Sequence, residues 1–146
     1  MKILVINGPN LNLLGIREPG IYGADTYDDL CRMILDKADA LGIEVSLYQS
    51  NHEGDIVTRI QQALGQEDAI VINPAAYTHT SIAILDALKA VRLPAAEVHI
   101  SDVSRRESFR QISYAGMACE AHYIGLGFEG YLRAMEYLAE KVGGNH

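Results

Sequence analysis

Tyr22, a side chain that could take a proton from a substrate, stands five residues after the cation Arg17 in one stretch of the chain. An unperturbed tyrosine ionises near pKa ~10, so few molecules carry a phenolate at neutral pH. A neighbouring cation favours the charged form and can lower a pKa by roughly 1–3 units. The pair therefore suggests a tyrosine base, beside a plainer alternative: an ordinary surface loop with an exposed arginine and a half-buried tyrosine.

The stretch that carries this pair, residues 7–23, follows an apolar run at 3–6 and precedes a capped helix start at 25–29. Strand-to-helix connections in α/β units usually take about 2–6 residues, and this one is far longer. It contains four glycines as possible hinges and two prolines as stiffeners. A long loop of this kind beside a buried strand is typical of a lid or a binding loop.

Strand and helix patterns alternate from one end of the chain to the other. The predicted strands are 3–6, 43–49, 69–73, 95–100 and 121–125, and the clearest helices are 27–41, 81–91 and 129–142. A further helix before Gly65 is expected to turn Ile56, Ile60, Ala63 and Leu64 inward. This alternation predicts one domain, residues 1–146, with a doubly wound five-stranded parallel sheet in three α/β/α layers. The order 2-1-3-4-5 is expected because only strand 43–49 alternates as an edge strand does.

Polar side chains stand where four of these strands end. They are Asn7, Gln49, Asn73 and His99. Ligands of doubly wound sheets bind outside the carboxyl ends of the strands, at the switch point between strands 1 and 3. A fold without a site needs only turn formers there, so this convergence favours a catalytic site.

Each candidate also has a structural interpretation. His79 could be only a residue of a helix's first turn, and His99 could be a satisfied core histidine. Glu97 precedes His99 by two residues, so both lie on the same face of the strand. Glu97 could therefore orient the imidazole. Asp86 lies four residues after the apolar Ile82, so the two share a helix face. Asp86 therefore either faces water at a helix edge or meets a neighbouring subunit's site. His122, inside the last strand, is interpreted as structural.

Composition and missing motifs limit the chemistry. The net charge is −7 with no basic run, which argues against nucleic acid or an anionic membrane as partner. Cys31 and Cys119 lie far apart without neighbouring ligands, so neither a metal site nor a disulfide is indicated. No lysine lies on the predicted rim for a Schiff base, and no phosphate-loop or nucleophile-elbow motif occurs. Acid–base chemistry by tyrosine and histidine, without metal or cofactor, remains.

Without an apolar span or a signal pattern, we expect a cytoplasmic protein.

Five runs of the sequence closely resemble the type II 3-dehydroquinate dehydratases, also called type II dehydroquinases. They are NGPNLNLLGIREPGIYG (7–23), QSNHEG (49–54), NPAAYTHTS (73–81), EVHIS (97–101) and GLGFEGY (125–131). The resemblance implies a flavodoxin-like fold and a trans elimination of water from 3-dehydroquinate, through an enolate, to give 3-dehydroshikimate. This reaction serves the shikimate pathway to aromatic amino acids, or quinate breakdown.

The same resemblance assigns the catalytic roles. Tyr22 would be the base, and Arg17 would keep it ionised and stabilise the transition state. Asn12 would help to hold the enolate through a water. His99, oriented by Glu97, would protonate the leaving hydroxyl.

Substrate binding and assembly are also implied by the resemblance. Asn73, His79 and Arg110 would bind the substrate's hydroxyls, and Ile100 with Ser101 would take its carboxylate, as a helix N-terminus there would suit an anion. Asp86 would reach in from a neighbour within a homododecamer, a tetramer of trimers.

Two positions depart from the family's usual pattern. Asp102 stands where the family usually has Asn, and Ser104 where it often has His. The added charge of Asp102 beside the expected carboxylate site predicts weaker substrate affinity. Two other functions stay open at this point: a flavodoxin-like module that binds a small nucleotide or flavin, and a catalytically dead oligomeric scaffold.

Overall fold

The computed structural model describes residues 1–16 and 25–143, so Arg17 and Tyr22 lie outside the described residues. Its centre is a five-stranded sheet in the order β2-β1-β3-β4-β5, with every neighbouring pair parallel. The strands are β1 (Lys2–Asn7), β2 (Glu44–Gln49), β3 (Ala69–Asn73), β4 (Ala95–His99) and β5 (Ala121–Ile124). The predicted order is confirmed, and the predicted strand bounds agree with these to within a residue at each end.

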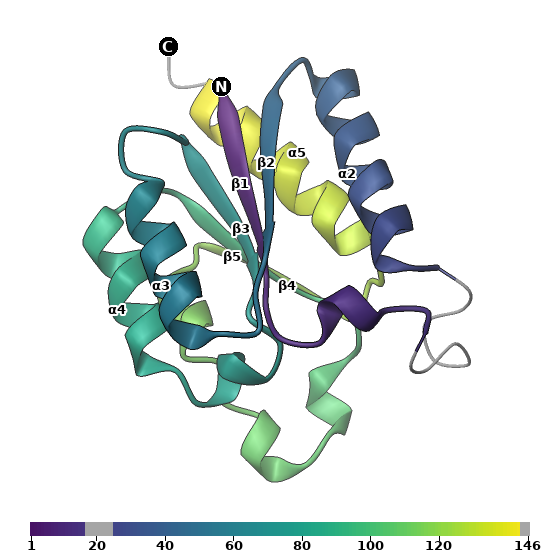
Figure 1. Cartoon of the computed structure of the whole chain (residues 1–146), viewed down its shortest axis with the longest axis vertical. Helices are drawn as coiled ribbons and strands as arrows, with labels where there is room; N and C mark the ends of the chain where they lie inside the picture. Colours follow the sequence, from purple (N-terminus) through teal and green to yellow (C-terminus); the bar gives the residue numbers. More distant parts are fainter. Residues whose placement is uncertain (17–24, 144–146) are drawn as a thin grey trace.

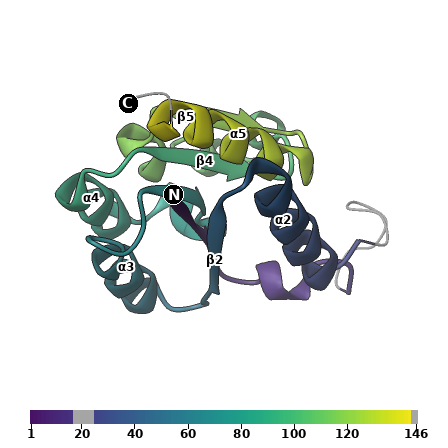
Figure 2. The ribbon, with the colours of Figure 1, turned by 90° about the horizontal axis from the view of Figure 1, so that it is seen from above.

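Within the described residues, four α-helices cover the sheet: α2 (Tyr27–Leu41), α3 (Glu53–Gln62), α4 (Ile82–Val91) and α5 (Glu129–Gly143). Helices α2 and α5 pack on one face and α3 with α4 on the other, as Figure 1 shows and the view in Figure 2 confirms. A parallel sheet needs this cover because its apolar strands are buried on both sides. None of the described helices is long and apolar enough to span a membrane.

Local sequence signals fix the ends of α2. The Thr26 hydroxyl accepts a hydrogen bond from the Asp29 amide at 3.2 Å, and the Asp29 carboxylate accepts one from the Thr26 amide at 2.9 Å. This capping box satisfies two amides that the first turn would leave without partners. Gly42 then ends the helix in the left-handed conformation, with φ 69°. The predicted helix 27–41 is therefore confirmed.

The inward stripe predicted for α3 is wrong at one position. Ile56, Ile60 and Ala63 are fully buried, but Leu64 is 64% exposed. The helix ends at Gln62, and the chain turns through Gly65 with φ 80°. Leu64 thus lies beyond the helix, where helical spacing no longer sets the direction of a side chain.

Short 3-10 turns occupy the connections that follow the strands. They are η1 (Leu11–Leu13), η2 (Ala75–His79), η3 (Val103–Arg105), η4 (Ser108–Arg110) and η5 (Ala115–Ala118). Turns η3 and η4 lie in the polar stretch between β4 and β5. These connections, not the helices, carry most of the polar residues discussed below.

Candidate active site

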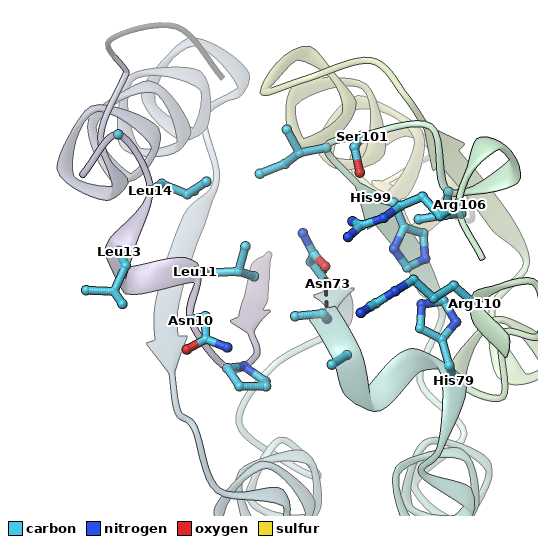
Figure 3. Close-up of a pocket in the computed structure, with 16 residues that line it drawn as sticks. Asn10, Leu11, Leu13, Leu14, Asn73, His79, His99, Ser101, Arg106 and Arg110 are labelled. Carbon is cyan, nitrogen blue, oxygen red and sulfur yellow. Dashed lines mark hydrogen bonds between the residues drawn. The ribbon is translucent and has the colours of Figure 1, made fainter. Parts of the chain in front are cut away.

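A cavity of about 280 Å³ opens at the carboxyl ends of the central strands, between the connections that follow β1, β3 and β4. Figure 3 shows its two walls: the η1 connection on one side, and the residues after β3 and β4 on the other. Its polar lining includes Asn10, Asn73, His79, His99, Ser101, Arg106 and Arg110. The cavity lies at the predicted switch point, and six of the predicted site residues line it: Asn73, His79, His99, Ile100, Ser101 and Arg110.

A buried tyrosine ties together the ends of the two central strands at this cavity. The Tyr131 hydroxyl donates to Asn7 Oδ1 at 2.6 Å and accepts from Asn73 Nδ2 at 2.9 Å. Asn73 Oδ1 accepts from the Ala75 amide at 3.1 Å, so both ends of its side chain are held. Burial raises the pKa of Tyr131, and also that of Tyr27, so both phenols stay neutral. Neither of these two tyrosines is suited to act as a base.

His99 is held by a buried carboxylate on its own strand. Its Nε2 lies 3.0 Å from Glu97 Oε2, and both side chains are almost fully buried. The Ser113 hydroxyl donates to the same oxygen at 2.7 Å, and His122 Nδ1 lies 2.5 Å from Glu97 Oε1. Burial acts to raise the pKa of Glu97, but these hydrogen bonds from His99, Ser113 and His122 outweigh it and lower the pKa to about 2. Glu97 is therefore a carboxylate at neutral pH, and the two ring nitrogens that face it carry its hydrogen-bonding protons.

Cationic side chains enter the cavity from the stretch after β4. Figure 3 shows the guanidinium groups of Arg106 and Arg110 directed into it near His99 and His79. Arg110 Nε donates to Glu107 Oε2 at 2.7 Å, which fixes the stem of that arginine. His79 Nδ1 lies 2.8 Å from the Ile112 carbonyl and so carries the proton. This lining suits a small anion with hydroxyl groups.

Three predicted residues of the described structure do not line the cavity: Glu97, which is buried beside His99, and the exposed Asn12 and Asp86. Asn12 is exposed on η1, and its Oδ1 accepts from Gln49 Nε2 at 3.3 Å. Asp86 is exposed on α4, next to Ile82, which is 54% exposed. Both residues would need a further contact, a water or a second subunit, to reach a bound molecule.

The helix expected after Ser101 is only the three-residue turn η3. Asp102 caps it, and its Oδ1 accepts from the amide of Ser104 at 3.1 Å and from its hydroxyl at 2.5 Å. The expectation of a regular helix after Ser101 is therefore wrong, and the capping carboxylate of Asp102 already accepts from the Ser104 amide. Ser101 and Ile100 nevertheless line the cavity.

Sequence analysis missed three contributors to this site. Arg106 stands in a polar run with several arginines, and nothing in that run marks which of them turn inward. Ser113 and His122 reach Glu97 from distant parts of the chain, and only the register of β4 against β5 could reveal His122. Within residues 1–16 and 25–143, no three histidine, cysteine or acidic side chains are placed to hold a metal ion.

Comparison with known proteins decides the family. The family model described as "Dehydroquinase class II" matches residues 1–139. The chain belongs to the class II dehydroquinase family. Its sequence is 53% identical over 138 residues to the 3-dehydroquinate dehydratase of Clostridium acetobutylicum, covering 94% of this chain and 96% of that protein. It is 49% identical over 142 residues to the enzyme of that name from Thermotoga maritima, covering 97% of each.

Solved structures of this family have the same fold. The type II dehydroquinase from Butyrivibrio crossotus superposes with a TM-score of 0.91 at 53% identity, over 94% of this chain and 97% of that one. The predicted flavodoxin-like fold is confirmed by this likeness and by the strand order. The family also sets aside both open alternatives, the flavin- or nucleotide-binding module and the inactive scaffold.

Proposed function

We propose that this chain dehydrates 3-dehydroquinate to 3-dehydroshikimate by a trans elimination through an enolate, with Tyr22 as the base and His99 as the acid. The dehydratase activity, a hydro-lyase reaction of the shikimate pathway, follows from the family and from the names of its relatives. The residue roles are the proposal. The observation that carries them is the buried Glu97–His99 pair, which presents an imidazole to the cavity.

The pairing with Glu97 suits His99 to donate a proton. An ionised carboxylate can only accept, so Nε2 of His99 carries the hydrogen in the 3.0 Å bond and Nδ1 remains to exchange a proton with substrate. The carboxylate also stabilises the imidazolium form before the proton leaves. A buried, fixed donor is what expulsion of hydroxide as water requires.

The base is assigned to Tyr22 with Arg17 beside it. The phenolate takes the carbon-bound proton next to the ketone, and the electron pair becomes the enolate. When the enolate collapses, the carbon–oxygen bond breaks and the departing hydroxide takes the proton of His99. Tyr22 has then gained one proton and His99 has lost one, so the next turnover begins once both have been reset.

The lining of the cavity supports binding of an anionic, hydroxylated substrate. Arg106 and Arg110 place positive charge in a molecule whose net charge is −7. Asn73 and His79 offer polar groups for hydroxyls, and Ile100 and Ser101 together take the carboxylate.

Asn12 and Asp86 complete the site from outside the lining. Asn12 reaches the enolate through a water with its Nδ2, because its Oδ1 already accepts from Gln49. Asp86 contributes from a neighbouring subunit.

We further propose that the chain forms a single catalytic domain that assembles in the cytoplasm as a dodecamer, a tetramer of trimers. The exposed Ile82 and Asp86 on α4 support a subunit contact there. Analytical ultracentrifugation tests this: a single species of twelve chains is expected, and a monomer would contradict it.

The experiment for the reaction follows the ultraviolet absorbance of the conjugated enone product. Turnover that survives borohydride excludes a lysine imine. Tyr22→Phe and His99→Asn each remove one proton-transfer group, and we expect kcat to fall about 10²–10⁴-fold in each. Tyr137→Phe is the matched control. Tyr137 lies on α5, its hydroxyl donates a hydrogen bond to Glu120 Oε2 at 2.9 Å, and it does not line the cavity. Full activity in Tyr22→Phe would contradict the proposed base.

A further inference from the structure

We propose that His122 is a positioning residue that makes His99 a stronger acid by sharing the Glu97 carboxylate with it. The inference rests on the proposed role of His99 as the proton donor. It concerns a residue that does not line the cavity and that the sequence alone indicated to be structural.

The register of the sheet places the three side chains in one row. Glu97 and His99 are two residues apart on β4 and therefore share a face. Glu97 lies directly opposite His122 in the parallel pairing of β4 with β5. Glu97 Oε2 accepts a hydrogen bond from His99 Nε2 at 3.0 Å, and Glu97 Oε1 accepts one from His122 Nδ1 at 2.5 Å. One carboxylate thus bridges two imidazoles, one at each oxygen.

The carboxylate cannot swing away from this arrangement. The Ser113 hydroxyl donates to Glu97 Oε2 at 2.7 Å and itself accepts from the Gly116 amide at 2.9 Å. A Cβ atom at position 116 would lie 2.5 Å from Glu97 Oε1, so only glycine leaves room for the carboxylate. The side chain of Glu97 is 3% exposed, whereas that of His122 is 44% exposed. His122 is therefore the most exposed of the three side chains that bind this carboxylate.

Other titratable groups lie around the cluster, but none of them binds Glu97. The Cys119 thiol lies near Glu97, and burial together with the Glu97 charge raises its pKa to about 12, so it stays neutral. On the cavity side, His79, Arg106 and Arg110 share the lining with His99. Because none of these four is hydrogen-bonded to the Glu97 carboxylate, His122 is the imidazole placed to change its basicity directly.

The direction of the effect follows from competition for charge. A donor at Oε1 draws negative charge to that oxygen and leaves a weaker acceptor at Oε2 for His99. His99 then holds its proton less tightly, which favours transfer to the leaving hydroxyl. Protonation of His122 would add a positive charge and push in the same direction. Removing His122 should therefore make His99 more basic and a slower donor.

The test compares His122→Ala with His122→Asn in the full-length enzyme, with 3-dehydroquinate as substrate. In His122→Ala we expect the basic limb of the kcat–pH profile to move up by about 0.5–1 pH unit and kcat to fall about 3–10-fold. KM should stay unchanged, because His122 does not line the cavity. His122→Asn should restore most of kcat and the wild-type profile, since its amide can donate to Oε1 without titrating. His52→Asn is the control, because His52 is an exposed imidazole at the start of α3 whose side chain makes no capping hydrogen bond.

The outcomes separate this inference from the proposed function. A His122→Ala profile that superposes on the wild type overturns it, and so does a His122→Asn profile shifted as far as that of His122→Ala. Thermal unfolding of each variant is measured in parallel: a lower Tm with an unmoved pH profile means a purely structural role and also overturns the inference. If His99→Asn keeps full activity, the assignment of the acid fails instead.

Discussion

The hydroxyl of Tyr131 joins Asn7 and Asn73, the last residues of the two central strands, through hydrogen bonds of 2.6 and 2.9 Å. The tyrosine comes from α5, 124 residues after Asn7. The last helix of the chain thereby fixes the side chain of Asn73, which lines the cavity. This contact couples the stability of the fold to the geometry of the site.

Tyr131→Phe should therefore weaken both folding and substrate binding. It removes one hydroxyl and leaves two buried amide groups without their partner, which costs about 1–3 kcal/mol of unfolding free energy. We expect KM to rise severalfold, because the Asn73 amide loses one of its two anchors. Chemical denaturation and steady-state kinetics measure the two effects. Tyr137→Phe, whose hydroxyl binds Glu120 at the surface, is the matched control and should change neither by much.

The two neighbouring arginines of the polar stretch should differ sharply. Arg106 lines the cavity, whereas the side chain of Arg105 is 87% exposed and lies 3.7 Å from Asp102. Arg106→Ala removes a cation that faces the anionic substrate, so we expect KM to rise at least about 10-fold, the effect of losing one charge-assisted hydrogen bond of about 1.5–3 kcal/mol. Arg105→Ala should leave KM within about twofold, since an exposed ion pair contributes little. Equal effects in the two variants would contradict the assignment.

The sequence predicted the framework well, and the reason is local. The apolar runs that become β1 and β3 and the alternation of β2 suffice to place the edge of the sheet, and Thr26 with Gly42 marks both ends of α2. Leu64 was placed wrongly because helical spacing does not reveal where a helix ends.

The contacts that complete the site were less accessible to sequence reasoning, because they join distant segments. Ser113 and His122 meet Glu97 across 16 and 25 residues, and Tyr131 meets Asn73 across 58. Single-sequence patterns report which face a residue shares with its near neighbours. They do not report the register of β4 against β5.

The low pKa of Glu97 predicts a pH dependence of stability. Its pKa falls from the usual 4.5 to about 2 in the folded protein, so the folded state favours the ionised form. This stabilisation is complete above pH ~4.5 and is lost as the pH falls from there towards 2. It contributes at most about 3 kcal/mol to the free energy of unfolding. Urea unfolding at pH 6 and pH 3 measures it. Glu97→Gln should be less stable at pH 6 and lose less stability than the wild type on acidification, whereas an equal loss in both would contradict the prediction.

The Asp102 carboxylate should weaken substrate binding through its charge. Hydrogen bonds from the Ser104 hydroxyl and amide hold the pKa of Asp102 below its usual value, so it is ionised at neutral pH. It follows Ser101, which lines the cavity, and its side chain is 47% exposed, so water screens it strongly. We expect Asp102→Asn to lower KM by about two- to threefold at low salt, and by less at 0.5 M salt, where the Debye length falls to about 4 Å. A KM that is unchanged or higher in Asp102→Asn would contradict the prediction that this charge weakens binding.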